Sequence, residues 1–211
     1  MSWRPRRHSR MRRQGYAVLV QDAVGIAEMS RPDFLAHIDI FVTIYAAAMQ
    51  AGPDELPSRE AIMRRHTGNP GFRALAVYRG TPARIVAFTY GFHGQHGQWW
   101  HDVVHAGIIG RADQATADGW LDDVVEIAEV HVHPDYQARG IGRGMVLTLA
   151  SGRAERTAVL STRDSETPAR HLYRSLGFVD LLTGFLFPGG GPAYAVMGAT
   201  LPLSDHGGQH G

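Results

Sequence analysis

The sequence predicts a single α/β domain, on three observations. In the second half of the chain, apolar segments with strand character alternate with segments whose apolar residues recur at helical spacing. In the first half, helical segments precede two strand-like segments joined by a short turn. The 211 residues, of which 44% are hydrophobic and 19% charged, suffice for one sizeable core and argue against a disordered or fibrous protein.

The first half of the chain is predicted to contain three strands and two helices. In order, these are a strand at Tyr16–Val20, helices at Arg31–Met49 and Ser58–His66, and strands at Phe72–Tyr78 and Arg84–Phe92. Ser30 is a favourable N-cap for the first helix, and Pro32 lies in its first turn, where proline is tolerated. A turn at Gly80–Pro82 joins the last two strands.

The second half is predicted to alternate strands with helices and to end in a hairpin. The expected elements are a strand at Val124–His133, a helix at Gly142–Arg153, a strand at Ala158–Thr162, a helix at Pro168–Leu176, and hairpin strands at Leu181–Phe187 and Tyr194–Leu201. Residues 93–121 are interpreted as an insertion with one short helix, in which Trp99 and Trp100 cover the sheet or line an acceptor cleft.

Both ends of the chain are expected to lie outside the domain, which is predicted to span residues 15–203. Residues 1–14 form a basic tail with six arginines, and residues 204–211 a disordered tail rich in Gly and His. We assign the basic tail no function and expect neither nucleic acid nor membrane as a partner. The apolar runs are too short to cross a bilayer, and Gln21 and Asp22 interrupt the one that would complete an export signal. A cytoplasmic protein is therefore expected, and a homodimer is left open.

Two residue types are missing from the sequence, and each absence excludes a kind of chemistry. The chain has no Cys, which rules out disulfides and a cysteinyl acyl-enzyme intermediate. All 21 basic residues are Arg, so that no Lys can form a Schiff base or serve as the phosphate-binding lysine of a Walker A loop. Any acyl transfer must therefore proceed by direct attack on the donor.

The most informative segment is EIAEVHVHPDYQARGIGRG, Glu126–Gly144. Here an apolar strand ends at Pro134, and a helix begins after two glycines at 140 and 142. Such glycines let successive backbone N–H groups point at one anion beside the positive end of the helix. A dinucleotide-binding fingerprint would need a third glycine where Met145 stands, and a merely tight turn would not need the flanking Gln and Arg residues.

Two separate motifs give the chain a family resemblance. Val132–Gly142, V-H-P-x-x-Q-x-R-G-x-G, resembles the acetyl-CoA pyrophosphate loop of GCN5-related N-acetyltransferases (GNAT). ARHLYRSLGF, Ala169–Phe178, is similar to the helix that follows in that family, with its Tyr and its Gly-Phe turn. The resemblance covers residues 126–178. It implies the family's fold, a central mixed sheet splayed at its middle with helices on both faces.

The resemblance also implies where acetyl-CoA binds as co-substrate. The pantetheine arm would be bound by the backbone of His131, Val132 and His133, and the pyrophosphate by Gln137, Ala138, Arg139, Gly140, Ile141, Gly142 and Arg143. One position departs from the family pattern, because Glu166 stands where the family often has a cofactor-binding Asn. The insertion at 93–121 is also longer than usual, so that the acceptor cannot be inferred by analogy.

The central strand and the following helix carry the catalytic candidates. An alkyl amine with a pKa near 10.4 is almost entirely protonated at neutral pH, so a general base is useful. Glu126 corresponds by resemblance to the catalytic Glu of histone-type members, and Glu129 is the second candidate. Strand alternation places Glu126 opposite to Glu129, His131 and His133, unless a bulge intervenes. Tyr173 matches the family's Tyr, which would protonate the departing CoA thiolate.

Histidines in the insertion raise the question of a metal site. His93, His96, His101 and His105 include one pair at i, i+4, but acidic residues do not cluster with them in the sequence, so no metal is expected. The sequence therefore predicts acetyl transfer from acetyl-CoA to a primary amine of a small molecule or peptide in a ternary complex. The alternatives are a non-catalytic acyl-CoA sensor and a protein N-acetyltransferase.

Overall fold

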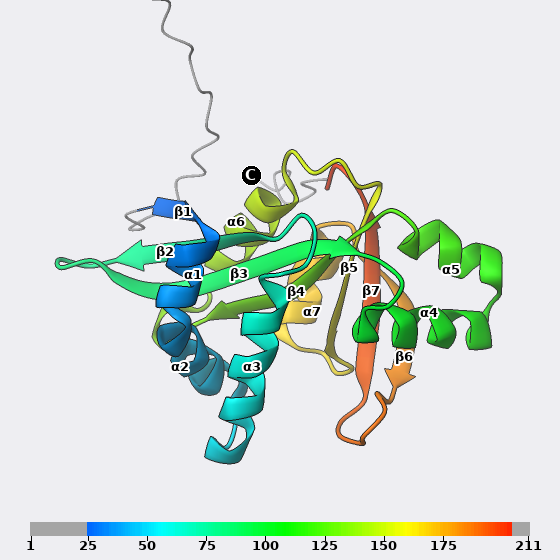
Figure 1. The fold of residues 1–211 in the computed structure, drawn as a ribbon, viewed down its shortest axis with the longest axis horizontal. Coiled ribbons are helices and arrows are strands. Elements are labelled where there is room, and N and C mark those ends of the chain that lie inside the picture. The colour runs from blue at the N-terminus through cyan, green and yellow to red at the C-terminus, as the bar shows by residue number, and fades with distance from the viewer. Residues whose placement is uncertain (1–24, 204–211) are drawn as a thin grey trace, which may run out of the picture.

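The computed structural model describes residues 25–203 as a sheet with helices on both faces (Figure 1). The predicted strand at Tyr16–Val20 and both predicted tails lie outside the described residues. The strands are β1 (Gly25–Met29), β2 (Arg73–Arg79), β3 (Arg84–Gly94), β4 (Val124–Val132), β5 (Thr157–Arg163), β6 (Val179–Phe185) and β7 (Tyr194–Thr200). The α-helices are α1 (Arg31–Ala36), α2 (Ile38–Met49), α3 (Leu56–His66), α4 (Trp99–Arg111), α5 (Gln114–Leu121), α6 (Ile141–Ala150) and α7 (Pro168–Ser175).

The strands form one seven-stranded sheet in the order β1-β2-β3-β4-β5-β7-β6. Neighbouring strands are antiparallel except β4 and β5, which are parallel. These two pair only at Val124–Glu126, opposite Thr157–Val159. Beyond Glu126 they are no longer paired, so the sheet opens between its two central strands. This arrangement is the splayed mixed sheet that the family resemblance implied.

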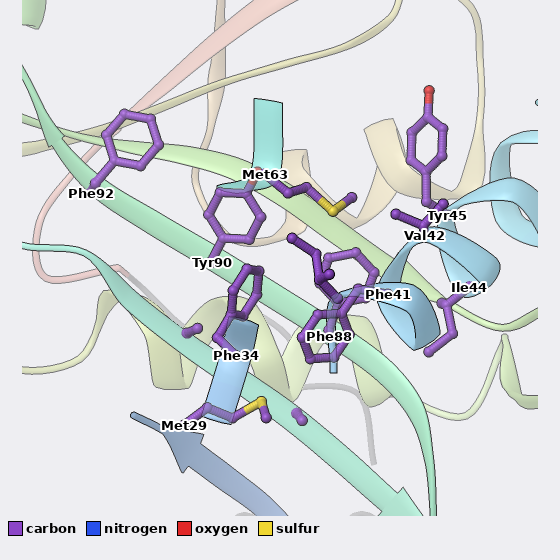
Figure 2. Packing of buried hydrophobic residues seen from close by; sticks show 13 residues of the cluster. Met29, Phe34, Phe41, Val42, Ile44, Tyr45, Met63, Phe88, Tyr90 and Phe92 are labelled. Atoms are coloured by element: carbon purple, nitrogen blue, oxygen red, sulfur yellow. The ribbon is translucent and has the colours of Figure 1, made fainter. Parts of the chain in front are cut away.

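Helices α1, α2 and α3 cover the β1–β4 half of one face with an aromatic core (Figure 2). Phe34 stacks on Phe41 at 4.7 Å between ring centroids and meets Tyr90 edge-on at 5.3 Å. Phe41 in turn lies 4.6 Å from Phe88 of β3. Each of these rings is fully buried, and burial of such a side chain contributes about 2–3 kcal/mol. The packing fixes α2 and α3 against the strand that pairs with β4.

The remaining helices complete both faces of the sheet. On the face that α1–α3 occupy, α4 and α5 cover the other half through a cluster that includes Val104, Leu121 and Val196. On the opposite face, α6 and α7 pack through Leu149 and Tyr173 among other residues. Within the described part of the chain, no helix is both long and apolar enough to span a membrane.

Two predicted elements differ in the structure, and one strand was not predicted. The single helix expected at Arg31–Met49 is two helices that break at His37, whose backbone leaves the helical region with φ −112° and ψ 15°. The insertion contains two helices, α4 and α5, rather than one short one. β1, Gly25–Met29, is this additional strand; GIAEM is short and its β propensity is weak. The other strands and helices predicted within residues 25–203 are confirmed, with ends shifted by a few residues.

Candidate active site

A β-bulge in β4 sets the positions of the acidic side chains. Against β3, Glu129 lies opposite Tyr90 and Ile127 opposite Gly91, which leaves Ala128 as an extra residue. Glu126 therefore lies opposite Phe92 and faces the same side of the sheet as Glu129. Simple alternation, which placed the two carboxylates on opposite faces, is wrong here because of the bulge. Both point toward the α1–α3 side.

Glu129 is held as a buried carboxylate by two cationic or proton-donating partners. Arg59 of α3 donates from Nη1 to Glu129 Oε1 at 2.9 Å, and His131 Nε2 contacts Glu129 Oε2. Arg59 also donates to the Tyr45 hydroxyl at 3.2 Å and lies over that ring. Burial acts to raise the pKa of Glu129, but the charge and hydrogen bond of His131, with the charge of Arg59, outweigh burial and lower it.

Glu126 has the opposite electrostatic character. The residue is 4% exposed, and no hydrogen bond to its side chain occurs among the residues that the structure describes. Burial, followed by the charge of Glu129, raises the pKa of Glu126 to about 8. The site thus holds one ionised and one largely protonated carboxyl group at neutral pH. Environments that separate two carboxyl pKa values in this way are typical of acid–base catalysis.

Neutral aromatic groups line the α3 side of this acidic pair. His66 Nδ1 lies 3.1 Å from the hydroxyl of Tyr90, and its ring packs against Phe92 at 4.9 Å. Burial lowers the pKa of His66 to about 4, so that its ring is neutral at physiological pH. Burial also raises the pKa of Tyr90 well above its usual value. The only cation in contact with Glu129 from α3 is therefore Arg59, among the described residues.

Tyr173 lies in the core on the α6–α7 face of the sheet. Its ring packs 5.7 Å from Phe178, and the backbone N–H of Phe178 donates to the Tyr173 carbonyl in the turn that ends α7. Burial raises the pKa of Tyr173, and the charge of Glu129 adds to the effect.

The loop after β4 presents backbone N–H groups at the start of α6. Ala138 and Gly140 both have left-handed backbones, with φ of 58° and 75°. For Ala138 that conformation costs about 1–2 kcal/mol, a strain that often marks a ligand site. The first helical residues, Ile141, Gly142 and Arg143, have N–H groups without intrahelical acceptors. The loop is exposed and suits a pyrophosphate group.

The end of β4 has backbone groups that face the gap between β4 and β5, where the two strands are no longer paired. The N–H of His133 donates to the carbonyl of Val86 on β3, so alternation turns the backbone of Val132 toward the gap. Gln137 closes the loop by donating from Nε2 to the Val132 carbonyl at 3.0 Å. Of the three predicted pantetheine contacts, Val132 thus faces the gap, whereas the N–H of His133 is engaged in the sheet. The side chain of His131 belongs to the Glu129 network.

The two arginines of the predicted cofactor loop make different contacts. Arg139 donates to the Asp135 carbonyl at 2.9 Å and lies over the Tyr136 ring. Arg143 donates to the Ser175 hydroxyl at 2.8 Å and thereby links α6 to the end of α7. Glu166, at the position of the family's Asn, pairs instead with Arg174 at 3.0 Å.

Sequence reasoning missed the α3 residues of the site. Arg59, Met63 and His66 are spaced i, i+4, i+7, so they share one face of α3. That spacing was available from the sequence, but two of the three residues are polar, and a search for apolar periodicity passes over them. Their role follows only from the packing of α3 beside β4.

A mixed sheet that opens between β4 and β5, with a glycine loop at the start of α6, is the fold of acyl-CoA N-acyltransferases. Comparisons with known proteins agree with this fold. Residues 95–180 match the family model described as acetyltransferase (GNAT) domain. The GCN5-like protein acetyltransferase Rv2170 of Mycobacterium tuberculosis is 28% identical over 205 residues, which cover 86% of this chain and all of that protein. Residues 95–180 thus match a GNAT acetyltransferase domain, and the chain is an acyltransferase enzyme.

Solved structures of the family share the fold at low sequence identity. yncA from Salmonella typhimurium, solved with its cofactor acetyl-CoA, has a TM-score of 0.54 at 17% identity, over 83% of this chain and 92% of its own. The ribosomal-protein-S18-alanine N-acetyltransferase of Escherichia coli has a TM-score of 0.54 at 18% identity, over 85% and 94%. At these identities the likeness establishes the fold.

Proposed function

We propose that this enzyme transfers the acetyl group of acetyl-CoA directly to a primary amine, with Glu126 as the general base. The observation that carries the proposal is the pair Glu126 and Glu129. Their pKa values are shifted in opposite directions at the point where the sheet opens. The absence of Cys from the sequence supports direct attack, because no thiol can carry the acetyl group.

The residues around the opening fit acetyl-CoA. The N–H groups of Ile141, Gly142 and Arg143 would hold the pyrophosphate, and the backbone of Val132 would hold the pantetheine arm in the gap. The left-handed backbones of Ala138 and Gly140 support this assignment, since they turn the loop toward an anion. Acetyl-CoA supplies an acetyl group activated as a thioester.

The two carboxyl groups would divide the work on the acceptor. Ionised Glu129, whose two oxygens are engaged by Arg59 and His131, would contribute by raising the pKa of Glu126. Glu126, in its carboxylate form, takes a proton from the amine as the new C–N bond forms and the C–S bond breaks. A base with a pKa near 8 is better matched to an amine of pKa about 10.4 than a base of pKa about 4. Tyr173 would return a proton to the thiolate.

A lysine side chain of a protein is the acceptor that we favour. The similar protein from M. tuberculosis is named a protein acetyltransferase, which supports a protein side chain as the acceptor. A small-molecule amine remains the second candidate. We also propose that the protein is cytoplasmic and has no nucleic-acid or membrane partner. Whether it forms a homodimer is left open.

Release of CoA with different amines tests the proposal. We expect release with a lysine-containing peptide, and a fall in kcat/KM of about 10² to 10⁴-fold in Glu126→Gln. Glu60→Gln, on the outer side of α3 in an exposed pair with Arg64, is the matched control and should keep wild-type activity. If acetyl-CoA binds but no amine causes CoA release, the non-catalytic sensor replaces this proposal. If Glu126→Gln turns over like wild type, the role of Glu126 is refuted.

A further inference from the structure

A cluster of histidine and aspartate side chains lies in the insertion, apart from the acetyl-transfer site. His96 is in the loop before α4, His101, Asp102 and His105 are on α4, and Asp118 is on α5. The imidazole centroids of His96 lie 5.0 Å from His101 and 5.1 Å from His105. Asp102 directly follows His101 in the sequence, and the fold brings its carboxylate to His96 and that of Asp118 to His105.

We propose that His96, His101 and Asp102 bind a divalent transition metal ion, with zinc as the best match. One ligand atom from each residue lies within 4.8 Å of the other two. His96 Nδ1 and His101 Nδ1 lie 3.3 Å and 3.4 Å from Asp102 Oδ1. In a tetrahedral zinc site with bonds of about 2.0–2.1 Å, neighbouring ligand atoms are about 3.3 Å apart. Imidazole nitrogen and carboxylate oxygen are both ordinary zinc ligands.

The hydrogen bonds of His101 support a cation more than a simple His–Asp contact. His101 Nε2 lies 3.1 Å from the Leu121 carbonyl, which can only accept, so the ring proton is on Nε2. In the neutral ring, Nδ1 then carries a lone pair that faces the Asp102 carboxylate at 3.4 Å. Two acceptors that face each other repel, whereas a metal ion between them would bind both. Donation of the other ring N–H to a carbonyl is also the usual arrangement of a metal-bound histidine.

The surrounding contacts orient the remaining ligands. The backbone N–H of Gly97 donates to both oxygens of Asp102, at 3.2 Å and 3.0 Å. His101 is 2% exposed, whereas the side chain of His96 is 70% exposed, so the cluster has a rigid inner ligand and an accessible outer one. His105 is held by Asp118 at 2.8 Å beside the cluster, and the fourth metal position is left to water.

A bound metal ion would connect the insertion to β4, the strand that carries Glu126 and Glu129. The Leu121 carbonyl that holds His101 ends α5, three residues before β4 begins at Val124. A metal ion at this cluster would therefore fix the loop before α4 and α4 itself against the start of β4.

Metal binding to the full chain tests this site. The protein is treated with a chelator, dialysed, and titrated with Zn²⁺ in competition with a chromophoric chelator. We expect wild type to bind one equivalent at least tenfold more tightly than His96→Gln or Asp102→Asn. His171→Gln, which removes an exposed histidine on α7, is the control and should bind like wild type.

Two further readouts keep the outcome decisive. Co²⁺ should give the visible absorption of a tetrahedral site in wild type and not in His96→Gln, and Zn²⁺ should raise the Tm of wild type more than that of Asp102→Asn. His96 is exposed, so its variant is expected to fold, which circular dichroism checks. Equal affinity in all four proteins, or no stoichiometric binding by wild type, would overturn the proposal.

Discussion

Replacement of Glu126 by Gln should remove a pH-dependent destabilisation of the fold. Burial raises the pKa of Glu126 from an ordinary 4.5 to about 8. The neutral form is therefore favoured in the folded state. The stability that it provides is fully present below pH 4.5 and is lost as the pH rises through 8. At about 1.4 kcal/mol per pH unit, the full difference corresponds to about 5 kcal/mol.

The measurement is urea unfolding of wild type and Glu126→Gln at pH 6.5 and pH 9. His66 does not interfere in this pH range. Because its pKa is lowered from 6.5 to about 4 in the folded protein, its titration raises the free energy of unfolding only between about pH 4 and pH 6.5. Across it, the free energy of unfolding of wild type should fall by about 2 kcal/mol more than that of the variant. Glu60→Gln should change with pH as wild type does. If wild type and Glu126→Gln show the same fall, Glu126 does not titrate near pH 8 and the reasoning fails.

Two further substitutions test the acid and the core. Tyr173→Phe keeps the ring in its packing against Phe178, so the free energy of unfolding should stay within about 1 kcal/mol of wild type. Turnover should fall at least tenfold. Unchanged turnover when chemistry is rate-limiting would exclude Tyr173 as the acid. Phe34→Ala should lower the free energy of unfolding by about 3–5 kcal/mol in urea titrations, since Phe34 is fully buried among three other rings. A loss below 1 kcal/mol would contradict the packing of α1.

Local features of the sequence could be predicted well. The loop from Gln137 to Gly142 and the helix after it depend on neighbouring residues, namely Gly140, which takes a left-handed backbone, and the apolar face that follows it. The hairpin of β6 and β7 is equally local. These elements were found because the chemistry that forms them lies within a few residues.

Features that depend on register or on distant segments could not be predicted. The common face of Glu126 and Glu129 depends on a bulge at Ala128, which is visible only in the pairing with β3. Arg59 reaches Glu129 across 70 positions of sequence, because α3 packs beside β4. Tertiary packing therefore decides which polar side chains become a site, and periodicity alone does not reveal it.

Calorimetric titration with acetyl-CoA tests the central claim most directly. Gly142→Asp places a carboxylate at the second residue of α6, where it favours the helix N-terminus but repels a pyrophosphate group. Gly119→Asp on α5, where an added side chain meets nothing within 4 Å, controls for the added charge; the Cβ added at Gly142 lies 3.3 Å from Leu172 Cδ2, the end of a side chain that can shift. Wild type and Gly119→Asp should bind acetyl-CoA with one equivalent and similar affinity, and Gly142→Asp at least tenfold more weakly. Absence of binding by wild type, or equal binding by all three proteins, would contradict acetyl-CoA binding at this loop.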